Sequence, residues 1–231
     1  MSAEQPSQPS LRDRKKAETR TNIAHAAVEL LVTEGPEQTT IARIADAAEI
    51  SQRTFHNYFP HREAAMFHYM ENLLDALCRD VLNCADGQPL VEVAKNVAVG
   101  LYFHGSSFSD ATPTSPYPTT PGNFNAIHAL KMVVEHLTLH RVDDMCTAAP
   151  RDNPVDFLSP LVDALMEYAS RNSEELSRFH ALMMVSNALW VCGTVYETRE
   201  LPEYSQGKTE HQLLEEAFAF TTAGTFPDSE G

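Results

Sequence analysis

Residues 40–64 read TIARIADAAEISQRTFHNYFPHREA, and this stretch decides the fold. Thr40 and Ser51 are residue types that cap helix N-termini, and each precedes a short helical pattern. Only Ala48-Glu49-Ile50 separate the two patterns, and Pro60 ends the second. Two short helices joined by so tight a turn, after a longer helix, indicate a helix-turn-helix module.

The apolar residues of this stretch have the spacing that such a module needs. Ala45 is small where the two helices must approach, Ile50 and Phe55 fill the space between them, and Ile41 and Ile44 pack beneath. The other side of the third helix is polar, and its side chains are long enough to reach base edges or phosphates in a major groove. These candidates are Gln52, Arg53, Thr54, His56 and Asn57.

Residues 12–62 resemble the DNA-binding domain of TetR-family transcriptional regulators. The resemblance is carried by Thr-Ile-Ala-Arg-Ile-Ala-x-Ala-Ala from residue 40, by Ser-x-Arg-Thr-Phe from residue 51, and by Tyr58-Phe59. The basic preface from Leu11 and the form Gln-Arg-Thr-Phe-x-x-Tyr-Phe-Pro look most like the actinobacterial branch linked to acyl-CoA-like ligands. The resemblance implies a helix-turn-helix domain followed by a helical domain that binds an effector and dimerises.

The resemblance also implies a set of DNA contacts. Thr40 and Arg43 would touch the phosphate backbone, and Arg62 takes the place of a lysine that grips a phosphate in the family. Arg53 is the expected base reader, because bidentate binding of Arg to guanine is the commonest specific contact. The full predicted set is Lys15, Lys16, Thr40, Arg43, Ser51, Gln52, Arg53, Thr54, His56, Asn57, Tyr58 and Arg62.

Two residues depart from the family pattern. His56 stands where the family commonly has Tyr or Phe, so the contact made there is open and involves a group that titrates near neutral pH. Glu49 replaces the usual turn glycine. A non-glycine residue must then adopt the turn conformation at some strain.

The rest of the chain also predicts helices, and the fold class is all-α. Helical patterns cover about 11–34, 61–84, 90–104, 123–148, 160–171, 174–199 and 208–222, with Ser159 and Asn172 or Ser173 as expected caps. We expect a flexible tail at 1–10, a DNA-binding domain at 11–60, an effector-binding and dimerisation domain at 61–222, and a tail at 223–231.

The helix at 174–199 is apolar almost all round, so it must be buried on more than one side. It is either a central core helix or a helix that closes on a second copy of the chain. The amphipathic helix at 208–222 could complete such an interface, and the resemblance implies a homodimer through these two helices. Two recognition helices would then read a near-palindromic site.

The effector pocket is less well defined by the sequence. Phe103, Phe124, Met132, His136 and Trp190 lie on helices that could wall a cavity, and the Pro-rich loop at 105–122 is a candidate cover for its entrance. His128, His136 and His140, followed by Asp143, Asp144 and Cys146, leave a metal-responsive regulator of the same fold as an alternative. No resident cofactor or metal is predicted.

The charge distribution and the sequence motifs limit the classes of function that the chain could have. The net charge is −15, but residues 1–63 carry −1 and residues 64–231 carry −14. This asymmetry fits an N-terminal domain that tolerates nucleic acid, joined to an acidic C-terminal domain. A helical interaction module that does not bind DNA specifically is the alternative function. No phosphate-binding glycine loop, nucleophile elbow or His-Glu-x-x-His motif occurs, so we expect no enzyme.

The sequence also indicates where in the cell the protein is expected to reside. The polar N-terminus lacks the apolar stretch of a signal peptide, and the irregular spacing of the four cysteines suggests a reducing environment. The apolar run 181–193 is too short to cross a bilayer. We therefore expect a cytoplasmic protein that makes no membrane contact.

Overall fold

The computed structural model describes residues 10–104, 124–139 and 157–223. Within these ranges the regular structure is helical and no strand occurs, which confirms the all-α class. The tails, the loop at 105–122, His140 and the segment from Asp143 to Cys146 lie wholly or largely outside the described residues.

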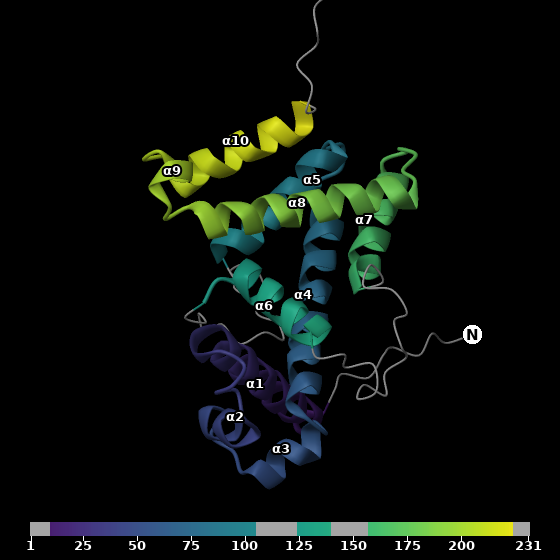
Figure 1. Cartoon of the computed structure of the whole chain (residues 1–231). Helices are drawn as coiled ribbons and strands as arrows, with labels where there is room; N and C mark the ends of the chain where they lie inside the picture. Colours follow the sequence, from purple (N-terminus) through teal and green to yellow (C-terminus); the bar gives the residue numbers. More distant parts are fainter. Residues whose placement is uncertain (1–9, 105–123, 140–156, 224–231) are drawn as a thin grey trace, which may run out of the picture.

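Three helices form a small head at one end of the molecule: α1 (Leu11–Glu34), α2 (Ile41–Ala47) and α3 (Gln52–Tyr58). The helix α4 (Arg62–Asn83) then runs from this head into the upper half of the molecule (Figure 1). It packs against α1 near its start and extends beside α7, so one continuous helix joins the head to the body.

The body is built around the far part of α4. It contains α5 (Leu90–His104), α7 (Ser159–Arg171), α8 (Arg178–Thr198), the short α9 (Pro202–Ser205) and α10 (Glu210–Ala223). The helix α6 (Ala126–Leu139) lies between head and body and contacts α1, α4, α5 and α8 (Figure 1).

Local capping explains the boundaries in the head. The hydroxyl of Thr40 accepts a hydrogen bond from the Arg43 backbone N–H at 3.3 Å, and that of Ser51 accepts one from the Thr54 N–H at 3.0 Å. Ile44, Ala45 and Phe55 are buried between the helices, and Ile41 and Ile50 pack against them half-buried. Both predicted caps and the predicted core of the module are confirmed.

Three boundaries in the body differ from the prediction. Ser159 does not cap α7, because the cap position is taken by Leu158 and Ser159 is already helical. The next helix begins at Arg178 rather than 174, and its cap is Ser177, whose hydroxyl accepts from the His180 N–H. Asn172 instead ends α7. The predicted helix at 123–148 is described only as α6.

Helix α8 is also longer than the apolar run inside it. By length and composition alone, the whole helix is long and apolar enough to cross a membrane, although the apolar run 181–193 inside it is shorter. It packs against α5, α6, α7 and α10, and 33% of its apolar window is buried. The remainder of this apolar window is exposed in one copy of the chain.

The turn between α2 and α3 depends on Glu49, whose φ is 53°. This left-handed conformation costs an L-residue about 1–2 kcal/mol relative to the right-handed one. The turn is held by the Ile50 N–H, which donates to the Ala45 carbonyl at 2.9 Å. The predicted strain at the position of the missing glycine is therefore present.

Replacing Glu49 with Gly should raise the free energy of unfolding by about 0.5–1 kcal/mol, because glycine adopts positive φ at no steric cost. Urea denaturation measures the change. Glu49→Ala is the matched control, since alanine keeps the penalty. Equal stabilisation by both substitutions would show that the side chain of Glu49, and not its backbone, limits stability.

Candidate nucleic-acid interface

The outer side of α3 carries exposed polar residues. Gln52, Arg53, His56 and Asn57 are exposed, while Phe55 on the opposite side is fully buried. The Phe55 ring packs edge-on against His56 and tilted against Phe59, and Phe59 carries the Arg20 guanidinium 4.6 Å above its centroid. The buried aromatic pair thus fixes which face of α3 points outward.

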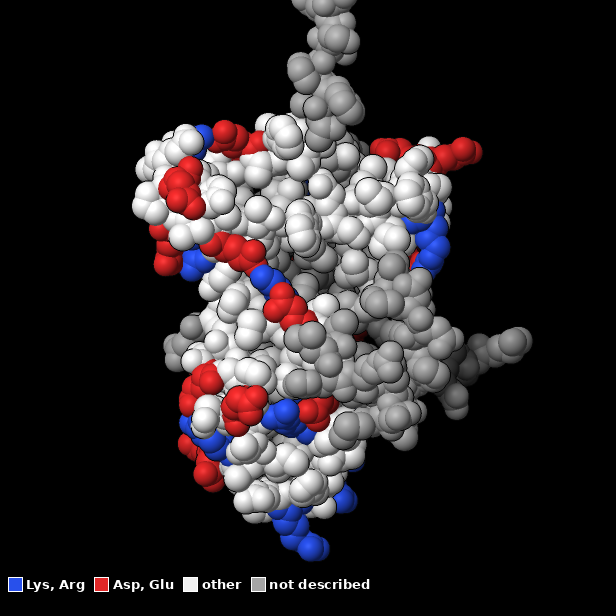
Figure 2. Space-filling view, in the orientation of Figure 1, with Lys and Arg blue, Asp and Glu red and all other residues white. Residues whose placement is uncertain are grey.

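A groove separates α3 from the first turns of α1. Its lining includes Lys15 and Lys16 from α1 and Thr54, Asn57 and Tyr58 from α3. The structure therefore brings together five of the residues predicted to contact DNA. Figure 2 shows basic side chains at the tip of this end, a mixture of acidic and basic ones higher on the head, and acidic ones at the edges and across the front of the upper half.

Thr40, Ser51 and Arg43 are partly committed to the fold. The first two cap helices, as described above. The Arg43 guanidinium makes a two-pronged ion pair with Glu34 at the end of α1, with Nη2 to Oε1 at 2.7 Å. This hydrogen-bonded pair lowers the pKa of Glu34 and raises that of Arg43. An exposed pair of this kind contributes little stability, so Arg43 remains exchangeable toward a phosphate.

Arg62, a predicted phosphate contact, makes hydrogen bonds within the protein. Its Nη1 donates to the backbone carbonyls of Pro36 and Thr39, both at 2.8 Å, and its Nε donates to Glu63 at 2.7 Å. The side chain is half-buried and braces the loop between α1 and α2. Nε and Nη1 of Arg62 are therefore engaged inside the protein, and the contact of this residue with a DNA phosphate stays a prediction.

Glu63 is a buried carboxylate that the sequence reasoning missed. Its side chain is 11% exposed, and its Oε1 lies 3.6 Å from His136 Nε2 on α6. The pKa of Glu63 is lowered to about 2, first by a hydrogen bond with His136. The hydrogen bond and the positive charge of Arg62 lower it further, and together these effects outweigh the opposite effect of burial. Acidic residues are common in the first turn of a helix, so the sequence gives no sign that Glu63 is unusual. Only its contact with His136 on α6 distinguishes it.

The five residues predicted to wall an effector pocket do not converge in the described part of the chain. Trp190 is 77% exposed, so it does not line a cavity within one chain. His136 is engaged by Glu63. Phe103 stacks on His211 with 4.1 Å between centroids, and Phe124 packs on His25 and Tyr69. Met132 is half-buried against the core.

A narrow apolar cleft lies elsewhere, between α4, α5, α7 and α8. Its walls are aliphatic and carry no charge, and they are formed by Leu77, Val81, Ala94, Val97, Ala98, Leu161, Val185, Ala188 and Leu189. The aromatic residues singled out from the sequence are absent from this lining. Aliphatic residues could not be distinguished from ordinary core by their spacing alone.

The histidines considered as metal ligands are separated from one another by their packing. The His128 ring lies against Tyr196, 5.0 Å between centroids, and desolvation lowers its pKa. His136 faces Glu63 instead. Among the residues that the structure describes, no group of three or more His, Cys, Asp or Glu side chains could hold a metal ion. His140 falls in the part that is not described.

Known proteins match the chain mainly in the head. The model for bacterial regulatory proteins of the tetR family matches residues 23–68. The HTH-type transcriptional regulator TcmR of Streptomyces glaucescens is 41% identical over 58 residues, which span 25% of this chain and 26% of TcmR.

Two solved structures are similar over most of their length. One is a tetR family transcription regulator from Shewanella sp. PV-4, with 16% identity, a TM-score of 0.48, and coverage of 87% of this chain and 95% of that one. The other is FadR of Thermus thermophilus in complex with lauroyl-CoA, with 21% identity, a TM-score of 0.48, and coverage of 92% and 98%.

The cluster around Glu63 predicts a pH dependence of stability. Its folded pKa of about 2 lies below the ordinary 4.5, so the cluster stabilises the fold fully above pH 4.5 and loses this contribution as the pH falls toward 2. At pH 6, Glu63→Gln should cost on the order of 2–3 kcal/mol of unfolding free energy.

This difference between wild type and variant should shrink as urea denaturation is repeated from about pH 5 down to about pH 2. Glu71→Gln is the control, because its carboxylate is 45% exposed beside His68 and should give only a small difference. A difference for Glu63→Gln that stays constant with pH would contradict the ionised cluster.

Proposed function

Since residues 23–68 match the model for bacterial regulatory proteins of the tetR family, we propose that the chain is a ligand-responsive, DNA-binding transcriptional regulator. It acts in the cytoplasm as a homodimeric repressor on a palindromic operator, and a small apolar effector releases it. The match to a family of regulators agrees with the expectation that the chain is not an enzyme. The observation that carries the proposal is the exposed polar face of α3 beside the basic start of α1.

The division of labour on DNA follows from chemistry. Arg53 is the base reader, because an exposed guanidinium can bind guanine O6 and N7 together. Lys15 and Lys16, across the groove from Asn57, supply charge against the phosphates and position the head without reading sequence. His56 is exposed one helical turn from Arg53 and adds a hydrogen-bonding contact at the same edge.

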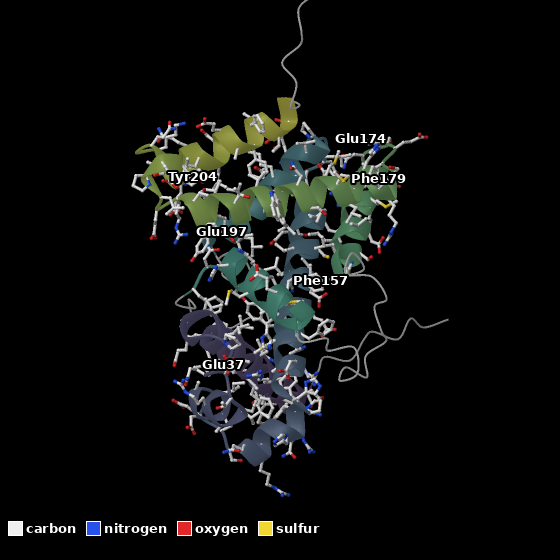
Figure 3. The ribbon with its side chains drawn as sticks, in the orientation of Figure 1. Glu37, Phe157, Glu174, Phe179, Glu197 and Tyr204 are labelled. Atoms are coloured by element: carbon white, nitrogen blue, oxygen red, sulfur yellow. The ribbon has the colours of Figure 1, made fainter. Side chains whose placement is uncertain are left out.

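The dimer is supported by the exposed apolar stripe of α8. Phe179, Met183 and Trp190 are 66%, 52% and 77% exposed, and their spacing of four and seven residues puts them on one face. Phe220 on the neighbouring α10 is 63% exposed. Figure 3 shows Phe179 at the end of α8 nearest α7, far from Tyr204 on α9.

A second copy of the chain explains this surface better than a lipid does. In an isologous dimer the same patch covers itself on both copies, so both apolar stripes are buried at once. A spanning helix would have to leave α5, α7 and α10, with which it now shares the core. The two α3 helices would then lie about 34–36 Å apart, one turn of DNA.

The effector is proposed to be apolar because the cleft between α4, α5, α7 and α8 is aliphatic. Its narrowness in this state means that a ligand must separate the helices that line it. By linkage, such a ligand releases DNA only if it binds the DNA-incompetent arrangement more tightly. The acidic charge of the body disfavours a polyanionic effector.

Arg53→Ala should weaken binding to the operator by about 1–3 kcal/mol and weaken binding to unrelated DNA far less. Lys16→Ala is the matched control, because loss of a phosphate contact weakens both alike and lowers the salt slope by about 1. Fluorescence anisotropy on a fragment selected by the wild-type protein, beside an unrelated fragment, measures this. Equal losses for Arg53→Ala would remove it as the base reader.

Trp190→Glu should raise the dimer dissociation constant at least about thirtyfold, since a buried aromatic at the centre of an interface is a typical hot spot. Sedimentation equilibrium gives the constant. Tyr204→Glu changes another exposed aromatic, on α9 and outside the stripe, and should leave the dimer intact. A Trp190→Glu protein that dimerises as the wild type does would place the interface elsewhere.

A further inference from the structure

A connected set of contacts between polar side chains runs from α6 into the head. His136 on α6 is 5% exposed, and its Nε2 lies 3.6 Å from Oε1 of Glu63, at the start of α4. The same carboxylate oxygen accepts from Arg62 Nε at 2.7 Å, and Oε2 lies 3.4 Å from His61 Nδ1. Glu63 thus joins α6 to the first turn of α4.

Arg62 extends the set to the loop that carries α2. Its Nη1 donates to the carbonyls of Pro36 and Thr39. Thr39 is fully buried, and its hydroxyl donates to the Gly35 carbonyl at 2.8 Å, so this loop is tied at several points. Because Thr40 caps α2 directly afterwards, the position of this loop sets the position of α2 and, through the tight turn, of α3.

We propose that His136, Glu63 and Arg62 are positioning residues that couple the place of α6 to the place of the loop at 35–39, and through it to the DNA-reading face of α3. The physical basis is that a buried carboxylate cannot lose a hydrogen-bonding partner without a large cost. When α6 shifts, Glu63 follows His136 or loses its contact, and either result changes the hold of Arg62 on the loop.

Helix α6 is placed to act as the input. It lies between head and body and contacts α1, α4, α5 and α8 (Figure 1). The coupling is a property of the fold and can be tested without DNA. Its consequence for gene control rests on the proposed function.

The first test uses hydrogen exchange on the full-length protein. His136→Phe keeps a ring but cannot donate to Glu63, and it should speed amide exchange at residues 35–48 by at least about fivefold. His136→Gln, whose amide can still donate, should restore slow exchange there. The control is His128→Phe, on the same helix but packed on Tyr196, and it should leave residues 35–48 unchanged.

Arg62→Lys keeps the positive charge but removes the guanidinium geometry. One ammonium group cannot bond both backbone carbonyls and the Glu63 carboxylate at once. The variant should loosen residues 35–48 and leave α6 protected. Unchanged exchange at residues 35–48 in folded His136→Phe, or faster exchange spread evenly over all helices, would overturn the coupling. If His136→Phe does not fold, the Arg62→Lys and His136→Gln proteins still decide the matter.

The second test is a double-mutant cycle read by operator affinity. His136→Phe and Glu63→Gln should each weaken binding at least about fivefold, and together no more than either alone, because both remove the same link. Independent, multiplying losses would overturn the link. Failure of the wild type to prefer any DNA would count against the proposed function, and the exchange result would stand apart from it.

Discussion

The structure depends on the continuity of α4. This single helix buries Ala65, Met66 and Tyr69 near the head and Leu77 and Val81 in the body. It is capped at its start by His61, whose Nδ1 accepts from the Ala64 N–H at 3.1 Å. Because the same rigid rod contacts α1 at one end and α7 farther along, head and body cannot change their relation without a change along α4.

The head could be predicted from sequence because its determinants are local. Thr40 and Ser51 each directly precede a helix and accept a hydrogen bond from the backbone N–H three residues later. The positive φ of Glu49 follows from the three-residue turn. The start of α8 could not be predicted in the same way. Asn172 looks like an N-cap, but its side chain accepts from Gly87 N–H and donates to the Tyr168 carbonyl, which are contacts with a distant turn and the preceding helix.

The candidate sites show the same limit. Exposure of Arg53 follows from the burial of Phe55 two residues later, which the local pattern predicts. The inward turn of Arg62 depends on carbonyls 23 and 26 residues away, and the partner of Glu63 lies on α6. The periodicity of α8 indicated a helix that is apolar all round, yet it could not say that Trp190 lies outside the core of one chain.

The central claim is that the groove between α1 and α3 and the outer face of α3 recognise specific DNA. The most direct test is the affinity of the wild-type protein for a fragment from upstream of its own gene and for an unrelated fragment, at two salt concentrations. We expect a preference for the upstream fragment that survives the higher salt while both affinities fall. Equal, weak binding to both, followed by failure of a genome-wide fragment selection, would contradict it and favour a helical interaction module.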